Sequence, residues 1–127
     1  MKDISELNPR GYKTNPFIDA NLKVLFDRVM HLQGCIGIDF VVTSGLRDPA
    51  QQLQLIKDGK SNALHSKHLA GAACDLYDPE GLLSDWCLSN LDALKNIGLW
   101  LEDPKHTPKW LHVQIFAPLS GKRVFIP

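Results

Sequence analysis

The sequence has no excess of charge of either sign. Fourteen Lys and Arg residues balance fourteen Asp and Glu residues among 127, and no block of about five or six like charges occurs. Such a chain lacks the long-range field that attracts nucleic acids or anionic lipid surfaces. We therefore expect neither a nucleic-acid partner nor a membrane partner.

Cysteine and long apolar runs are also scarce. Cys35, Cys74 and Cys87 are odd in number and form no C-x-x-C pair, which argues against a disulfide framework and against a thiolate zinc site. The first residues lack the apolar stretch of a secretory signal, and no later stretch approaches the ~20 apolar residues of a membrane span. We expect buried, reduced thiols in a protein that is synthesised in the cytoplasm without a signal peptide.

Length and periodicity predict a single α+β domain over residues 1–127, with an irregular lead-in over 1–16. One hydrophobic core usually serves a chain of this size, and the order of helical and strand patterns favours an antiparallel sheet with flanking helices. The turn over 118–121 is expected to join the last two strands as a hairpin. The patterns predict helices over 15–34, 49–58 and 84–97 and strands over 36–42, 72–77, 110–116 and 123–126.

The start of the second helix carries a recognisable set of terminal signals. Asp48 fits the N-cap, Pro49 the first helical position and Gln51 the third, while Gly59 fits the C-terminal stop. The loop before this helix carries Arg47, and a polar loop over 59–66 follows it. His65 in that loop is interpreted as a surface residue.

Two separate segments carry residues that suit a catalytic metal. The stretch SKHLAGAACD contains His68 and Asp75, and the later stretch WLHVQ contains His112. Two imidazoles and one carboxylate bind a divalent ion while leaving a coordination position for water, as in hydrolytic zinc sites. Ser66, at the start of the first stretch, could hydrogen-bond a substrate oxygen or the loop itself. The first hypothesis is a small metallohydrolase.

Strand alternation separates the candidate ligands from the core. In 110–116 the aliphatic residues Leu111, Val113 and Ile115 share one face, so His112 points to the other. In 72–77 the same rule places Asp75 opposite Cys74. Cys74 is therefore a poor candidate for a metal ligand.

The motifs SGLRDPAQQ, S-x-H-x-x-G-x-A-x-D and W-x-H, which span Phe40 to Gln114, resemble the zinc D-alanyl-D-alanine carboxypeptidase and L-alanyl-D-glutamate peptidase family. That family includes phage endolysins and shares its fold with the hedgehog signalling domain. The resemblance implies that His68, Asp75 and His112 bind Zn²⁺ and that Arg47 contacts the substrate or the developing oxyanion. An arginine suits that role because its fork of donors matches carboxylate and peptide oxygens.

The implied reaction is amide hydrolysis, in which a carboxylate takes a proton from water and passes it to the leaving amine. The family commonly has Glu or Asp three residues before the last His ligand, and this chain has Lys109 there. An ammonium group cannot accept that proton. Glu102 and Asp103 are the available substitutes, and Asp103 is slightly favoured because it lies at the edge of the following loop.

The resemblance favours a zinc metallopeptidase that hydrolyses short peptide bonds involving D-amino acids, with the peptidoglycan stem peptide as partner. As a phage or prophage product it would act at the cell wall. The alternative is a phage structural or interaction domain that keeps the metal site without catalysis, as Lys109 permits. The sequence leaves open which bond is cleaved, carboxypeptidase or endopeptidase action, and the oligomeric state.

Overall fold

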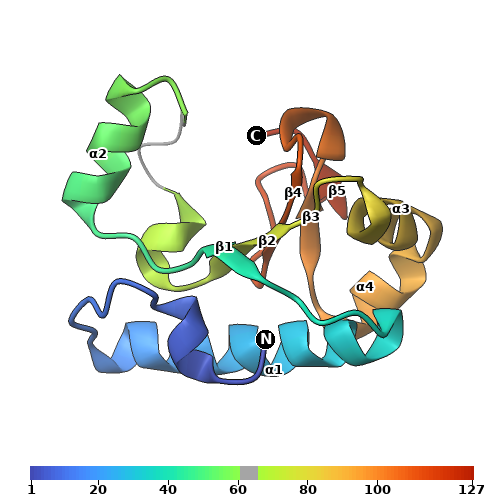
Figure 1. The fold of residues 1–127 in the computed structure, drawn as a ribbon, viewed down its shortest axis with the longest axis horizontal. Coiled ribbons are helices and arrows are strands. Elements are labelled where there is room, and N and C mark those ends of the chain that lie inside the picture. Colours follow the sequence, from blue (N-terminus) through green and yellow to red (C-terminus); the bar gives the residue numbers. More distant parts are fainter. Residues whose placement is uncertain (61–65) are drawn as a thin grey trace.

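The structure, a computed structural model, describes residues 1–60 and 66–127. These residues form a five-stranded sheet with helices around it, of which α2 (Pro49–Lys57) stands away from the sheet (Figure 1). Most of the predicted loop over 59–66, including His65, lies outside the described residues. The helices are α1 (Pro16–Ile36), α2 (Pro49–Lys57), α3 (Leu82–Ser89) and α4 (Leu91–Ile97), with short 3₁₀ turns η1 (Ile4–Leu7), η2 (Lys67–Ala70) and η3 (Pro104–His106). The strands are β1 (Val42–Ser44), β2 (Ala73–Tyr77), β3 (Trp100–Glu102), β4 (Trp110–Gln114) and β5 (Val124–Phe125).

The order of the strands across the sheet is β1-β2-β4-β3-β5. The pairs β1–β2, β2–β4 and β3–β4 are antiparallel, whereas β3–β5 is parallel. The α+β class predicted from the sequence is confirmed, and the sheet is mixed at its β5 edge. The predicted hairpin between the last two strands is wrong, because β3 occupies the edge of β4. The β5 strand then pairs with β3, where the Leu101 N–H donates to the Arg123 carbonyl oxygen at 2.9 Å.

The long helix α1 begins and ends at clear terminal signals. The Asn15 side chain accepts a hydrogen bond from the Ile18 N–H at 2.8 Å, and Pro16 occupies the first turn. Gly37 ends the helix with a φ of 79°, which favours glycine. The strand predicted over 36–42 is wrong at its start, because Ile36 still belongs to α1 and pairing begins only at Val42.

The other helices follow the sequence with one difference. Asp48 caps α2 by accepting the Gln51 N–H at 2.7 Å, as predicted. The helix expected over 84–97 is two helices, since Asn90 adopts a non-helical φ of −136° between α3 and α4. None of the helices in the described part of the chain combines the length and the apolar character needed to cross a bilayer.

One hydrophobic core joins α1, α3, α4 and one face of the sheet. The predicted strand faces are confirmed: Leu111, Val113 and Ile115 lie in the core, and so does Cys74. Cys87 is also buried, but the prediction for Cys35 is wrong, since it is exposed on α1. The opposite face of β2 and β4 is therefore left to carry polar groups.

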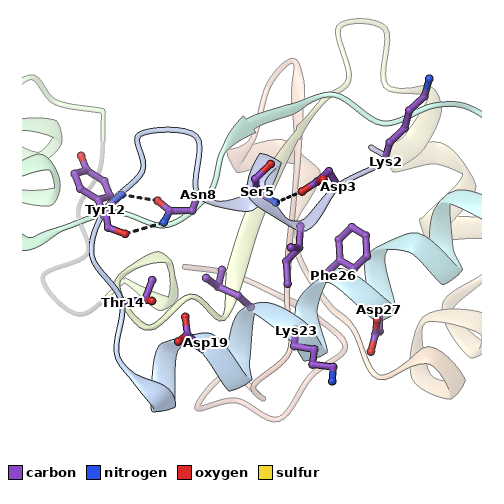
Figure 2. A pocket seen from close by; sticks show the side chains of 12 residues that line it. Lys2, Asp3, Ser5, Asn8, Tyr12, Thr14, Asp19, Lys23, Phe26 and Asp27 are labelled. Atoms are coloured by element: carbon purple, nitrogen blue, oxygen red, sulfur yellow. Dashed lines mark hydrogen bonds between the residues drawn. The ribbon is translucent and has the colours of Figure 1, made fainter.

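The lead-in packs along α1 (Figure 2). It contains the turn η1, which Asp3 caps through the Ser5 N–H, and Leu7 is fully buried in the core. The expected irregular surface segment is thus partly helical and partly core. A groove of about 740 Å³ separates it from α1. The residues lining this groove include Lys2, Asp3, Ser5, Asn8, Tyr12, Thr14, Asp19, Lys23, Phe26 and Asp27.

Candidate active site

The structure brings His68, Asp75 and His112 together on the sheet face opposite the core. Asp75 of β2 stands directly across from His112 of β4 in the strand register, and His68 reaches them from η2. All three are buried, and one potential ligand atom from each lies within 4.8 Å of the others. A metal ion could therefore be held by these three side chains.

The Asp75 carboxylate is the centre of this cluster. Its Oδ1 atom lies 2.9 Å from His112 Nδ1 and 3.3 Å from His68 Nε2. The two imidazole rings stand 5.2 Å apart at an angle of 64°. Both rings thus direct one nitrogen toward the same carboxylate oxygen.

The second nitrogen of each imidazole has a partner of its own. His68 Nδ1 lies 2.9 Å from the Gly45 carbonyl oxygen, which can only accept, so Nδ1 carries the proton and Nε2 keeps its lone pair. His112 Nε2 lies 2.9 Å from Gln114 Oε1, while the Gln114 Nε2 group donates to the Phe116 carbonyl. Such partners fix the orientation and tautomer of metal-binding histidines.

Burial and electrostatic coupling within the cluster together shift all three pKa values. Burial alone would raise the pKa of Asp75, but the adjacent His68 and His112 hold it well below its usual range. Burial lowers the pKa of His68. Burial also acts to lower that of His112, yet its contacts with Asp75 outweigh this and raise its pKa. The His112 ring therefore lies between two oxygens, with Nδ1 facing Asp75 Oδ1 and Nε2 facing Gln114 Oε1.

Local backbone geometry explains why His68 reaches the two strands. The Ser66 hydroxyl oxygen caps η2 by accepting the His68 N–H at 3.2 Å. Gly71 ends the turn with a φ of 70°, and a Cβ there would lie 3.1 Å from side-chain atoms of Ile18 and Leu22. A larger residue at position 71 would push η2 away from α1. The glycine between the two predicted ligands therefore serves close packing.

The loop beside His68 is also held by a close approach. A Cβ on Gly45 would overlap the Leu7 carbonyl oxygen, which accepts the Leu46 N–H at 2.8 Å. The Arg47 N–H donates to the His68 carbonyl oxygen at 3.1 Å. The buried lead-in thus supports the loop that orients His68.

Arg47 lies inside the cluster rather than at its rim. Its guanidinium donates to Ser44 Oγ at 3.1 Å, to Gln52 Oε1 at 3.1 Å and to Asp75 Oδ2 at 3.3 Å. Burial lowers its pKa, while Asp75 and Glu102 oppose that shift. No local sequence pattern singles out Gln52, whose side chain reaches Arg47 from α2.

A cleft of about 900 Å³ opens onto these residues. Its walls come from the residues that follow α2 and from η2, and from η3, β4 and the chain end. The predicted substrate contacts Arg47 and Ser66 both line it. The lining residues are Arg47, Gly59, Lys60, Ser66, His68, Asp75, Glu102, His106, Pro108, Trp110, His112 and Pro127.

The two candidate carboxylates are placed differently. Glu102 lines the cleft, and among the described residues no hydrogen bond engages its carboxylate. Burial raises its pKa, as does Asp75, while His112 and other cations oppose the shift. Asp103 is absent from the cleft lining, and its carboxylate instead accepts the Lys105 N–H at 3.0 Å as the cap of η3.

Lys109, which stands where a carboxylate was expected, does not line the cleft. It is an exposed residue with a φ of 72°, and its carbonyl oxygen accepts the Asp78 N–H at 2.9 Å. Its ammonium group therefore does not compete with a metal ion in the cluster.

The donor set fits a zinc ion. Two imidazole nitrogens and a carboxylate oxygen are ligands that zinc accepts, and each imidazole has the supporting hydrogen bond that such sites show. Cys74 faces the core, and burial raises its pKa, so a thiolate ligand is not offered. Gln114, for which the sequence predicted no role, belongs to the supporting groups.

Comparison with known proteins supports the fold. No protein-family model and no curated protein sequence matches the chain. Among solved structures, the chain is similar to the L-Ala D-Glu endopeptidase ChiX of Serratia marcescens, with a TM-score of 0.58 and 22% sequence identity. The match covers 91% of this chain and 94% of that one. The arrangement of helices and sheet is therefore similar to that of the solved endopeptidase.

Proposed function

We propose that the chain is a zinc-dependent peptidase that hydrolyses short peptide bonds involving D-amino acids, in the peptidoglycan stem peptide. The observation that carries this proposal is the buried His68, Asp75 and His112 cluster at the floor of an open cleft. The similarity to an L-Ala D-Glu endopeptidase supports the substrate class. As a phage or prophage product, the protein would act at the cell wall.

The chain's own groups can supply the remaining chemistry. A bound Zn²⁺ would polarise the scissile carbonyl and lower the pKa of water. Glu102 is the proposed general base, because its carboxylate lines the cleft and burial raises its pKa. It would take the proton of the attacking water and deliver it to the leaving amine.

Asp103 is the second candidate for this role. Its carboxylate would first have to leave the Lys105 N–H, and η3 would lose its cap. Glu102 needs no such rearrangement. We therefore place Glu102 ahead of Asp103, reversing the preference drawn from the sequence.

Substrate binding is proposed for Ser66 and Arg47. The Ser66 hydroxyl oxygen accepts the His68 N–H, and its own proton remains for a substrate oxygen. Arg47 uses one hydrogen on each of its three nitrogens for internal bonds, so one donor on Nη1 and one on Nη2 remain. Both residues line the cleft.

A non-catalytic domain with the same metal site is the second candidate function. Lys109, where related peptidases commonly carry a carboxylate, is the observation that favours it. The position of Glu102 in the cleft favours the peptidase, because Glu102 supplies there the carboxylate that position 109 lacks.

Hydrolysis of defined stem peptides tests the proposal. Zinc-loaded protein is incubated with a peptide containing the L-Ala–D-Glu bond and with one ending in D-Ala–D-Ala, and the products are identified by mass spectrometry. We expect cleavage at one of these bonds, and no product above background from His68→Ala. A zinc-replete protein that leaves both peptides intact would support the non-catalytic domain instead.

A further inference from the structure

Arg47 is anchored more completely than a substrate contact requires. Its guanidinium donates to Ser44, Gln52 and Asp75, and its backbone N–H donates to the carbonyl of His68. The side chain is only 11% exposed. An arginine held at these points has a fixed position, which serves the groups that hold it as well as a substrate that would reach its two remaining donors.

The two oxygens of Asp75 have different partners. Oδ1 faces His112 Nδ1 at 2.9 Å and His68 Nε2 at 3.3 Å. Oδ2 faces Arg47 Nη2 at 3.3 Å. Carboxylates bind metal ions through one oxygen or through both, and here only Oδ1 shares its surroundings with the imidazole nitrogens.

We infer that Arg47 is a positioning residue that reserves Asp75 Oδ2, so that Asp75 presents Oδ1 alone to a metal ion bound with His68 and His112. This inference rests on the metal site of the proposed function. Three single-atom ligands leave open coordination positions for water and for a substrate carbonyl. A second carboxylate oxygen would take one of those positions.

The chemistry of the arginine side chain suits this role. Its planar fork keeps three internal partners at fixed directions, which a lysine ammonium cannot do. The partners come from β1, α2 and β2, so the orientation of Asp75 is fixed by three elements at once. The charge of the buried guanidinium also balances that of the carboxylate, and removal of either partner alone would leave an unpaired buried charge.

Cobalt(II) substitution tests the inference without any turnover. The visible absorption of Co²⁺ is intense in four-coordinate sites and weakens as further ligands bind, so it reports coordination geometry. The spectrum and the Co²⁺ dissociation constant are measured for the wild type, Arg47→Met and Arg47→Lys. Arg123→Met is the matched control, because Arg123 stacks on Trp100 at 3.7 Å and does not line the cleft.

We expect an intense spectrum from the wild type and from Arg123→Met. Arg47→Met should keep its Co²⁺, because the three ligands remain, yet lose absorption several-fold as Oδ2 joins the coordination. Arg47→Lys should fall between them, since it keeps the charge without the fork. Thermal unfolding of each variant checks that it is folded. If Arg47→Met does not fold, the comparison of Arg47→Lys with the wild type decides the test.

Two other results have distinct meanings. Unchanged spectra for both Arg47 variants would overturn the inference, since a residue that only contacts substrate leaves the substrate-free site unaltered. Failure of the wild type to bind Co²⁺ or Zn²⁺ would overturn the metal site itself, and this inference with it.

Discussion

The two hollows of this molecule use polar side chains in different ways. In the groove along α1, most polar groups bond within their own segment: the Asp3 carboxylate accepts the Ser5 N–H, and Asn8 exchanges hydrogen bonds with Tyr12 (Figure 2). The Tyr12 hydroxyl, which donates to Gln51 Oε1 at 2.8 Å, is the exception among these three side chains. In the cleft, buried polar groups bond across long sequence separations, as between Asp75 and His112, which are 37 residues apart. Local bonds stabilise a segment, whereas these distant bonds create a site that exists only in the folded chain.

The free-energy cost of burying charged groups explains why the cleft and the groove differ. Burying a charged group without a partner is strongly unfavourable, so a coupled cluster of buried ionisable groups needs a compensating use. Each ionisable group of the cluster has a partner within 3.3 Å; these groups are Arg47, His68, Asp75 and His112. The groove contains Asp19, Lys23 and Asp27 on exposed positions of α1, where water solvates them. The predictions below therefore contrast variants of the two regions.

The largest effect is expected from Glu102→Gln. Loss of a general base lowers kcat by roughly 10²- to 10⁴-fold, while zinc binding should persist because the three ligands are untouched. Steady-state hydrolysis of the stem peptide and zinc content together measure both quantities. Asp103→Asn is the matched control and should retain most of its activity; a greater loss from Asp103→Asn than from Glu102→Gln would move the base to Asp103.

Gln114→Ala should weaken metal binding rather than abolish it. The amide oxygen orients His112 from its far nitrogen, and loss of such a partner typically weakens metal affinity about 10- to 100-fold. Competition titration against a chromophoric chelator gives the dissociation constant. Asp19→Ala in the groove is the comparison, and equal affinities for the two variants would show that Gln114 does not support the site.

Gly45→Ala should destabilise the protein through the lead-in. Its new Cβ would overlap the Leu7 carbonyl oxygen, and overpacking of this kind costs about 1–3 kcal/mol in the free energy of unfolding. Gly34→Ala, whose Cβ meets no atom within 4 Å, is the control and should not destabilise. Urea unfolding measures both, and equal midpoints would contradict the close approach.

Asp3→Ala tests the groove alone and should have the smallest effect. It removes the side-chain cap of η1, which is worth about 1 kcal/mol of unfolding free energy. Because the cap serves only its own segment, zinc affinity should be the same as in the wild type. A weakened affinity at unchanged stability would show that the two regions are coupled more directly than their contacts indicate.

The sequence predicted the centre of the site better than its surroundings. Strand alternation places Asp75 and His112 on one face whatever the partner strands are, and that prediction of faces is confirmed. The choice between Glu102 and Asp103 could not be made in the same way. It depends on β3, a strand too short to show a pattern, and on η3, whose cap takes the Asp103 carboxylate.

Local sequence patterns could not predict the residues that support the site, for the same reason. Gln52 reaches Arg47 from α2, and the Gly45 carbonyl oxygen faces His68 where the backbone of Gly45 passes close to Leu7. Sequence spacing carries no signal for such contacts. The predicted hairpin between the last strands failed because β3 pairs with β4 at that edge and β5 pairs with β3 instead.

Zinc dependence of peptide hydrolysis tests the central claim most directly. Protein freed of metal by a chelator is titrated with Zn²⁺ while cleavage of the stem peptide is followed. We predict no cleavage without metal and a rise in rate that levels off at about one equivalent, as for one three-ligand site. Full binding of one equivalent with no cleavage, or cleavage that survives complete removal of metal, would contradict the account.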